Sequence, residues 1–304
     1  MRSEHIGFAG HVFLYDVRKN GSLAVVTPRS VRPRLLGVQD ATVKDALGDT
    51  GIVLFRGFET APESFHAFAS RFASRFFFMP VADRASHPLA KELQTVTTGQ
   101  FALNLHFENG NTPMRPDLLW FYCVRPAIAD GETLVCDGVA LWEALRPEAQ
   151  RFFLEHEIVH RNTFPERLWR SVSGFGKEGD PLPEMTVLDI GPGTRCRLNP
   201  DRSMSIEYRT SAVGSSRFAR DRRGFVGNVL PDVYADDPLP VLEDGSPLPE
   251  AVIREVDETA AGLTSRITWK AGDVLVIDNT RWLHGRRAFE DPARTILMLC
   301  AVAN

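Results

Sequence analysis

The segment LNLHFENGNTPMRPDLLWFYC, residues 103–123, decides the fold. Both of its ends are apolar and typical of strands, yet His106 and Glu108 stand two residues apart in the first of them. Successive side chains of a strand alternate between its two faces, so these two groups project together and Phe107 points the other way. Each polar group is costly to bury alone. The pair therefore indicates that this strand face serves a ligand.

A third polar group of the same kind follows another strand-like run. His284 comes shortly after DVLVIDN, residues 273–279, and Gly285 follows it. Two histidines and one carboxylate on one face of a metal form the triad that leaves three positions open for non-haem Fe(II) chemistry. A His-x-Glu pair alone is a weak signal, because a single strand histidine is more often structural. Whether these residues bind a metal therefore has to be judged from the neighbouring segments.

Further apolar runs predict a protein rich in strands. We expect buried strands at GIVLFRGF (51–58), DLLWFYCVRP (117–126), ETLVCDG (132–138) and ARTILMLCAVA (293–303). Helical spacing of apolar residues predicts helices at 64–78, at 138–157 with a break near Pro147, and at 248–263. Strands that outnumber helices favour a β-rich α+β sandwich or barrel with flanking helices over an alternating parallel sheet.

The chain shows no repeat, low-complexity segment or long linker, so we expect one domain over residues 1–304. The region from about 160 to 250 is polar and rich in proline and glycine, apart from an expected strand pair at TRCRLN and MSIEYR. Long polar regions of this kind often cover a site. We predict a variable lid or insertion there.

The composition of the chain limits the kinds of partner that we expect. The formal charge of the 304 residues is -4, which leaves no electrostatic footprint for nucleic acid. No apolar window is long enough to span a membrane, and the start of the chain lacks the pattern of a signal peptide. Four widely spaced cysteines suit buried free thiols better than disulfides or a zinc knuckle. We expect a cytoplasmic protein that acts on a small molecule; its oligomeric state stays open.

Five stretches together resemble the taurine dioxygenase-like (TauD/TfdA) family of Fe(II)/2-oxoglutarate-dependent oxygenases. They are GIVLFRGF, LHFENG, PDLLWFYCVRP, DGETLVCDG and TWKAGDVLVIDNTRWLHGRRAFEDPARTILM. The resemblance covers most of the chain except about 160–245. It implies a double-stranded β-helix, or jelly-roll, core and an enzyme that uses Fe(II), 2-oxoglutarate and O2.

The resemblance also implies the roles of five residues. The Fe(II) ligands would be His106, Glu108 and His284. Thr133 and Arg294 would bind the far carboxylate of 2-oxoglutarate, which agrees with their chemistry, because a guanidinium can hold a carboxylate through two hydrogen bonds and a hydroxyl can add one. A surface ion pair with Glu290 or Asp291 is the alternative for Arg294.

Glu108 departs from the commonest family pattern, which has aspartate there. The glutamate resembles the clavaminate synthase-like branch, whose relatives largely oxidise amino acids and natural products derived from them. We therefore expect hydroxylation of an unactivated C–H bond in such a molecule, with desaturation or cyclisation as alternatives. Halogenation is disfavoured, because halogenating relatives replace this acid with a small residue.

Three further residues are candidates for substrate contact. Asn109 and Asn111 follow the metal-binding strand and either line the pocket or shape the turn before Pro113. Among the basic residues around His284, Arg286 is the candidate for an anionic substrate group. The alternative is that Arg281, Arg286 and Arg287 form a solvated face.

A competing motif is HEIVH, residues 156–160, which matches the H-E-x-x-H zinc signature. On a helix it would place two histidines on one face beside a general base. The β-branched residues Ile158 and Val159 instead indicate that a helix ends and a strand begins here, and no third-ligand extension follows. A zinc hydrolase and a non-catalytic jelly-roll binding protein remain remote alternatives.

Overall fold

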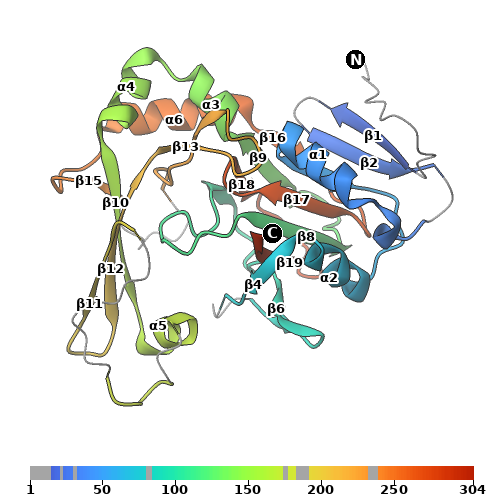
Figure 1. Cartoon of the computed structure of the whole chain (residues 1–304), viewed down its shortest axis with the longest axis horizontal. Coiled ribbons are helices and arrows are strands. Elements are labelled where there is room, and N and C mark those ends of the chain that lie inside the picture. Colours follow the sequence, from blue (N-terminus) through green and yellow to red (C-terminus); the bar gives the residue numbers. More distant parts are fainter. Residues whose placement is uncertain are drawn as a thin grey trace.

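Two facing β-sheets form the centre of the computed structural model (Figure 1). The structure describes residues 15–20, 23–29, 33–79, 84–173, 177–182, 192–231 and 239–304. In spatial order the larger sheet contains β1 (Tyr15–Asn20), β2 (Leu23–Pro28), β3 (Ile52–Phe55), β17 (Val274–Asp278), β8 (Leu118–Arg125), β19 (Thr295–Ala303), β6 (Ala90–Thr95) and β5 (Ser86–His87). A further strand, β4 (Ala73–Phe77), pairs with β19.

The smaller sheet carries the candidate metal ligands. Its spatial order is β16 (Ser265–Ile267), β9 (Thr133–Asp137), β18 (Trp282–Arg286) and β7 (Leu103–His106). Apolar side chains fill the space between the two sheets, among them Leu54, Phe121 and Leu275 from the larger sheet and Val135 and Trp282 from the smaller. This layering confirms the predicted β-rich jelly-roll core with flanking helices.

Two helices cover the outer face of the larger sheet. They are α1 (Asp40–Thr50) and α2 (Pro62–Ser70), and a short 3-10 turn, η1 (Leu35–Gly37), precedes α1. Phe65 and Phe68 of α2 pack with Trp120 of β8 in a buried cluster. The prediction of a helix over 64–78 was wrong beyond Ser70, because residues 73–77 pair with β19 as a strand. Tertiary pairing there overrides the helical spacing of the phenylalanines.

The outer side of the smaller sheet is covered by α3 (Gly138–Ala144), α4 (Pro147–Glu155) and α6 (Glu250–Leu263). Cys136 and Leu283 of the sheet pack with Leu141 of α3 and Val256 of α6. The predicted break at Pro147 is present, since this proline begins α4. A proline is well placed at a helix start, where its missing N–H would have no partner.

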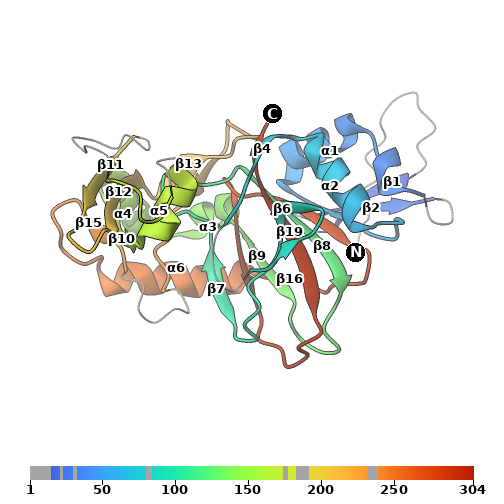
Figure 2. The same cartoon turned by 90° about the horizontal axis from the view of Figure 1, so that it is seen from below.

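A third sheet forms an arm that reaches away from the core (Figures 1 and 2). It contains β11 (Thr194–Leu198), β12 (Met204–Ser211), β10 (Glu157–Phe164) and β15 (Val241–Leu242), and α5 (Glu166–Ser173) lies near its far end. The hairpin of β13 (Val213–Ser215) and β14 (Arg223–Phe225) leads back to the core. The expected strand pair is confirmed as β11 and β12. That this region acts as a lid stays a prediction.

The basic residues around His284 do not form one solvated face. Arg281 is 4% exposed, and its Nη2 lies 2.6 Å from Asp137 Oδ2. Asp137 also caps α3 by accepting a hydrogen bond from the Val139 N–H. Arg286 is buried as well, and only Arg287 is partly exposed, beside Asp130. The alternative of a solvated face was therefore wrong, because folding buries two of the three guanidinium groups against acceptors on strand β9 and on the loop between β6 and β7.

Cys123, Cys136 and Cys300 are buried free thiols, as expected. Cys196, on the arm, is free and partly buried. No helix in the described part of the chain is long and apolar enough to cross a membrane.

Replacing Arg281 with alanine should destabilise the fold by about 3–5 kcal/mol, because it leaves the Asp137 carboxylate buried without its partner. The matched control is Arg287→Ala, which removes a partly exposed pair and should cost about 1 kcal/mol or less. Urea unfolding of both variants gives the two free energies. Equal losses would show that the buried pair contributes no more than the surface pair.

Candidate metal centre and co-substrate pocket

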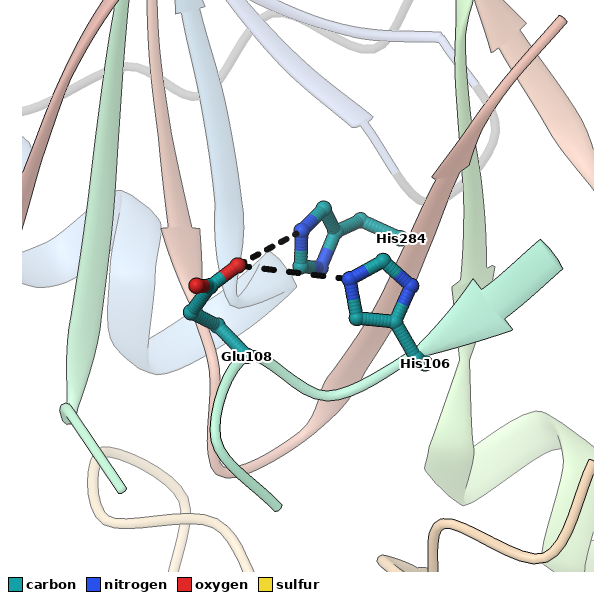
Figure 3. A group of neighbouring side chains, drawn as sticks. All are labelled: His106, Glu108 and His284. Carbon is teal, nitrogen blue, oxygen red and sulfur yellow. Dashed lines mark ion pairs between the residues drawn. The ribbon is translucent and has the colours of Figure 1, made fainter. Parts of the chain in front are cut away.

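Strand pairing brings the three predicted metal ligands together. In the register between β7 and β18, His106 lies opposite His284, and Glu108 follows two residues after His106. The Nε2 atoms of His106 and His284 lie 4.0 and 3.7 Å from Glu108 Oε2 (Figure 3). One ligand atom from each residue falls within 4.8 Å of the others. Metal–ligand bonds are roughly 2 Å long, so one ion can contact all three.

Each imidazole presents a nitrogen to the position of a metal. His106 Nδ1 is 2.8 Å from the carbonyl oxygen of Asn104. A carbonyl only accepts hydrogen bonds, so Nδ1 carries a proton and Nε2 is the nitrogen that faces Glu108 and a metal. Burial, followed by the charge of His106, lowers the pKa of His284 to about 4. His284 is therefore neutral near pH 7.

The carboxylate of Glu108 stays charged although it is only 6% exposed. Burial would raise the pKa of Glu108, but the charge of Arg84 and the contacts with His284 and His106 outweigh it and hold the pKa well below its usual range. Arg84 Nη2 donates to Glu108 Oε1 at 3.0 Å, which leaves Oε2 facing the histidines. Two imidazole nitrogens and one carboxylate oxygen fit Fe(II).

Arg294 lies in the same pocket as the triad, and Thr133 lines it too. Burial, followed by the charge of Arg286, lowers the pKa of Arg294 to about 10. Its Nη2 donates to the carbonyl of Gly131 at 3.0 Å, and its buried Nε has no hydrogen-bond partner within the described residues. A partly buried guanidinium with spare donors suits an anion from outside the chain.

The alternative for Arg294, a surface ion pair, is not seen among the described residues. The Asp291 carboxylate lies 3.9 Å from Arg125 instead. Thr133 Oγ1 accepts a hydrogen bond from Trp269 Nε1 at 3.0 Å. Because the hydroxyl is already an acceptor in that bond, its own proton is free to point at a carboxylate.

The three candidate substrate residues all line the pocket. Asn109 adopts a left-handed backbone with φ of 53°, and its side-chain amide donates to the Met114 carbonyl at 3.3 Å. Asn111 contacts Asn162 of β10 and so joins the metal-binding turn to the arm. Arg286 donates to the Thr97 carbonyl at 2.7 Å and to two further carbonyls in the same loop. Their contacts with substrate stay predictions.

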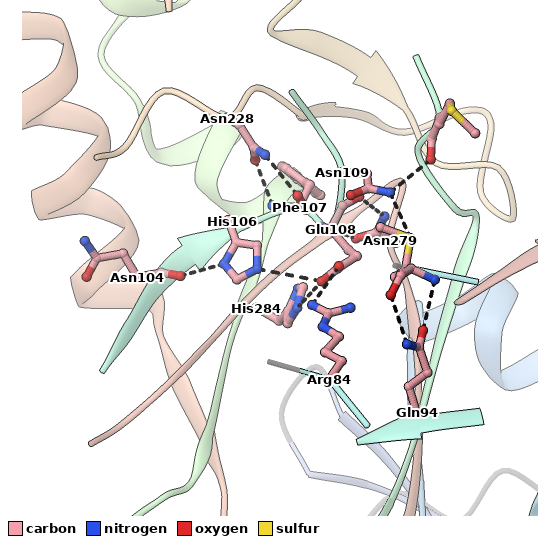
Figure 4. A network of polar contacts seen from close by, with 12 residues as sticks. Arg84, Gln94, Asn104, His106, Phe107, Glu108, Asn109, Asn228, Asn279 and His284 are labelled. Carbon is pink, nitrogen blue, oxygen red and sulfur yellow. Dashed lines mark hydrogen bonds and ion pairs between the residues drawn. The ribbon is translucent and has the colours of Figure 1, made fainter. Parts of the chain in front are cut away.

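The structure adds polar residues that the sequence interpretation missed. Arg84 precedes β5 outside any motif, so no signal marked it. Asn228 lies in the region that was left without assignment. Asn279 directly follows the buried strand β17, and a polar residue at such a position is a signal that could have been used. Figure 4 shows all three around His106, Glu108 and His284.

The HEIVH motif does not form a helical zinc site. α4 ends at Glu155, His156 caps it with an extended backbone, and residues 157–160 belong to β10. His156 Nδ1 pairs with Glu243 at 3.2 Å, whereas His160 is 4% exposed and burial lowers its pKa to about 4. Within the described ranges, the triad of His106, Glu108 and His284 is the group of three that could hold a metal.

Comparison with known proteins identifies the family. Residues 29–301 match the model of the family described as "Taurine catabolism dioxygenase TauD, TfdA family". The chain belongs to this family. It is therefore an oxygenase, and the cofactors of this enzyme class, Fe(II) and 2-oxoglutarate, fit the triad and the pocket described above.

Two sequence relatives and one solved structure are similar over most of the chain. A clavaminate synthase-like protein of Arabidopsis thaliana is 25% identical over 84% of this chain and 82% of its own length. The dapdiamide synthesis protein DdaC of Enterobacter agglomerans is 22% identical over 82% and 81%. PvcB, described as an Fe, alpha-ketoglutarate dependent oxygenase from an isonitrile synthetic pathway, superposes with a TM-score of 0.57 at 13% identity, covering 98% of this chain and 95% of its own.

Replacing His284 with alanine should abolish stoichiometric Fe(II) binding, because it removes one of three protein ligands. The control His156→Ala alters a histidine of the HEIVH motif and should bind Fe(II) as the unaltered chain does. Anaerobic titration with Fe(II), followed by metal analysis of the desalted protein, measures both. Loss of binding in His156→Ala with full binding in His284→Ala would place the metal at the HEIVH motif and contradict the assignment to the triad.

Proposed function

We propose that the protein hydroxylates an unactivated C–H bond of an amino acid or an amino-acid-derived intermediate of natural-product biosynthesis. In the overall reaction, substrate, 2-oxoglutarate and O2 give hydroxylated substrate, succinate and CO2. One oxygen atom enters the substrate and the other enters succinate. A cytoplasmic location, and the absence of nucleic-acid and membrane partners, stay predictions.

One observation carries this proposal: a single pocket is lined by the His106–Glu108–His284 triad and by Arg294, a partly buried arginine without an acidic partner among the described residues. A metal-binding protein without a co-substrate would not need Arg294 in such a place, since burial of an unpaired cation is unfavourable. The oxygenase is thus favoured over a non-catalytic binding protein.

Each residue has a distinct proposed role. His106, Glu108 and His284 hold Fe(II), which supplies the O2 chemistry when it is bound with 2-oxoglutarate. Arg294 and Thr133 bind the far carboxylate of 2-oxoglutarate and so orient its other end toward the triad. The apolar lining, which includes Phe121 and Met298, limits access of water.

Two observations support the proposed substrate class. Glu108, in place of the commoner aspartate, resembles the clavaminate synthase-like branch, and the sequence relatives carry clavaminate synthase-like and dapdiamide synthesis names. The described pocket lining also contains Arg84, Arg286 and Arg294 but Glu108 as its one carboxylate. A lining of this charge favours a substrate with a carboxylate. Asn109, Asn111 and Arg286 are the proposed substrate contacts.

Desaturation and cyclisation start from the same co-substrates, so the product decides among the three outcomes. We would incubate the protein with Fe(II), 2-oxoglutarate and a panel of amino acids and measure succinate and product mass. A product heavier by one oxygen atom supports hydroxylation, and loss of two hydrogens indicates desaturation or ring closure. No amino-acid-dependent succinate with any panel member would contradict the substrate class.

Arg294→Ala should raise the KM for 2-oxoglutarate about 10- to 100-fold, because it removes charge-assisted hydrogen bonds worth about 1.5–3 kcal/mol. Arg125→Ala is the matched control. This arginine pairs in register with Thr295, the residue next to Arg294, but its side chain is 57% exposed. Succinate formation against 2-oxoglutarate concentration gives both values. Similar KM values for the two variants would contradict the proposed role of Arg294.

A further inference from the structure

The short peptide that carries two of the three metal ligands, His106–Glu108, begins at the last residue of its strand and continues beyond it. β7 ends at His106, at the edge of the smaller sheet, and Phe107 and Glu108 follow it. An edge strand leaves a row of backbone N–H and C=O groups without a strand partner. Buried groups of this kind need other partners, and Phe107 is fully buried.

Side-chain amides satisfy these groups from two directions. Asn228 Oδ1 accepts from the Phe107 N–H at 2.8 Å, and Asn228 Nδ2 donates to the Phe107 carbonyl at 2.9 Å. Asn279 repeats the pattern on the next residue, accepting from the Glu108 N–H and donating to the Glu108 carbonyl, both at 3.0 Å. Each asparagine thus offers one acceptor and one donor to one residue, as a neighbouring strand would (Figure 4).

Gly110 provides the space for the close contact between Phe107 and Asn228. A Cβ at position 110 would lie 2.7 Å from Asn228 Nδ2 and 2.9 Å from Phe107 Cβ. Those two atoms belong to the two partners of this contact. A side chain at residue 110 therefore has to displace one partner or the other, and glycine leaves room for both.

We propose that Asn228 and Asn279 are positioning residues that act as substitute strand partners and hold the His106–Glu108 peptide in the conformation that binds Fe(II). Asn228 belongs to the 192–231 segment, which carries β11–β14 of the predicted lid region. The predicted lid region thus also supports the metal centre. This inference rests on the proposal that the triad binds Fe(II).

The chain offers a matched control for Asn228. Asn104, on β7, also uses a side-chain amide to join this strand to the same segment, since its Nδ2 donates to the Pro231 carbonyl at 2.8 Å. That bond lies outside the metal-binding peptide. Asn104→Ala therefore removes a similar link between the same two parts of the fold without freeing Phe107, and it keeps the backbone carbonyl that accepts from His106 Nδ1.

The test is the dissociation constant of Fe(II) for the metal-free protein, measured anaerobically without 2-oxoglutarate or substrate. Asn228→Ala should weaken Fe(II) binding by about 10-fold or more, as loss of partners that orient metal ligands usually does. Asn104→Ala should stay within about twofold of the unaltered chain. A residue that only contacted substrate would leave this constant unchanged.

Gly110→Ala tests the same contact without altering either asparagine, and it serves if Asn228→Ala does not fold. It should also weaken Fe(II) binding, and in a chain that already carries Asn228→Ala its additional effect should be smaller, because the Nδ2 atom is gone. The KM for 2-oxoglutarate, measured at saturating Fe(II), should change little, since Thr133 and Arg294 are untouched.

Two results would overturn the inference. Fe(II) affinities of Asn228→Ala and Gly110→Ala within twofold of Asn104→Ala would show that the amide contact does not position the ligands. Absence of Fe(II) binding by the unaltered chain would contradict the proposed function itself, and the inference with it. Measuring the unaltered chain beside the variants separates the two failures.

Discussion

The pairing of β7 with β18 is the constraint on which the site depends. It sets His106 opposite His284, although the two stand 178 positions apart along the chain. The same two strands present their apolar side chains, such as Leu283 and Leu105, to the helices on the outer side of the smaller sheet. A shift of one residue in this register would turn His284 to the other face and separate it from His106 and Glu108.

Burial at this site is offset by specific partners. Arg84 and the two histidines stabilise the charge of Glu108, and carbonyl oxygens of the loop between β6 and β7 accept the hydrogens of Arg286. Arg294 donates to the Gly131 carbonyl, and its buried Nε has no partner among the described residues. The pocket therefore contains a group of metal-ligand type and a guanidinium with a spare donor, which suits the proposed binding of Fe(II) and 2-oxoglutarate.

Local patterns predicted the strands and helices in which the spacing of apolar residues matches the residues that are buried. The runs around Leu118–Arg125 and Val274–Asp278 are continuous and apolar, and both are central strands. The pattern misled at 64–78, where phenylalanines at helical spacing continue into β4, because pairing with β19 is not recorded in local periodicity. It also misled at Arg281 and Arg286, whose acceptors come from distant segments.

The sequence by itself determined the family, and through that resemblance it predicted the triad and the two residues expected to bind 2-oxoglutarate, because iron and carboxylate chemistry requires particular residue types at particular places. Only the tertiary structure decided what holds that chemistry in place. Arg84, Asn228 and Asn279 reach His106–Glu108 from three separate parts of the chain, through side-chain bonds that leave no spacing rule behind. Such contacts depend on packing between distant segments, and the order of residues along a chain does not record them.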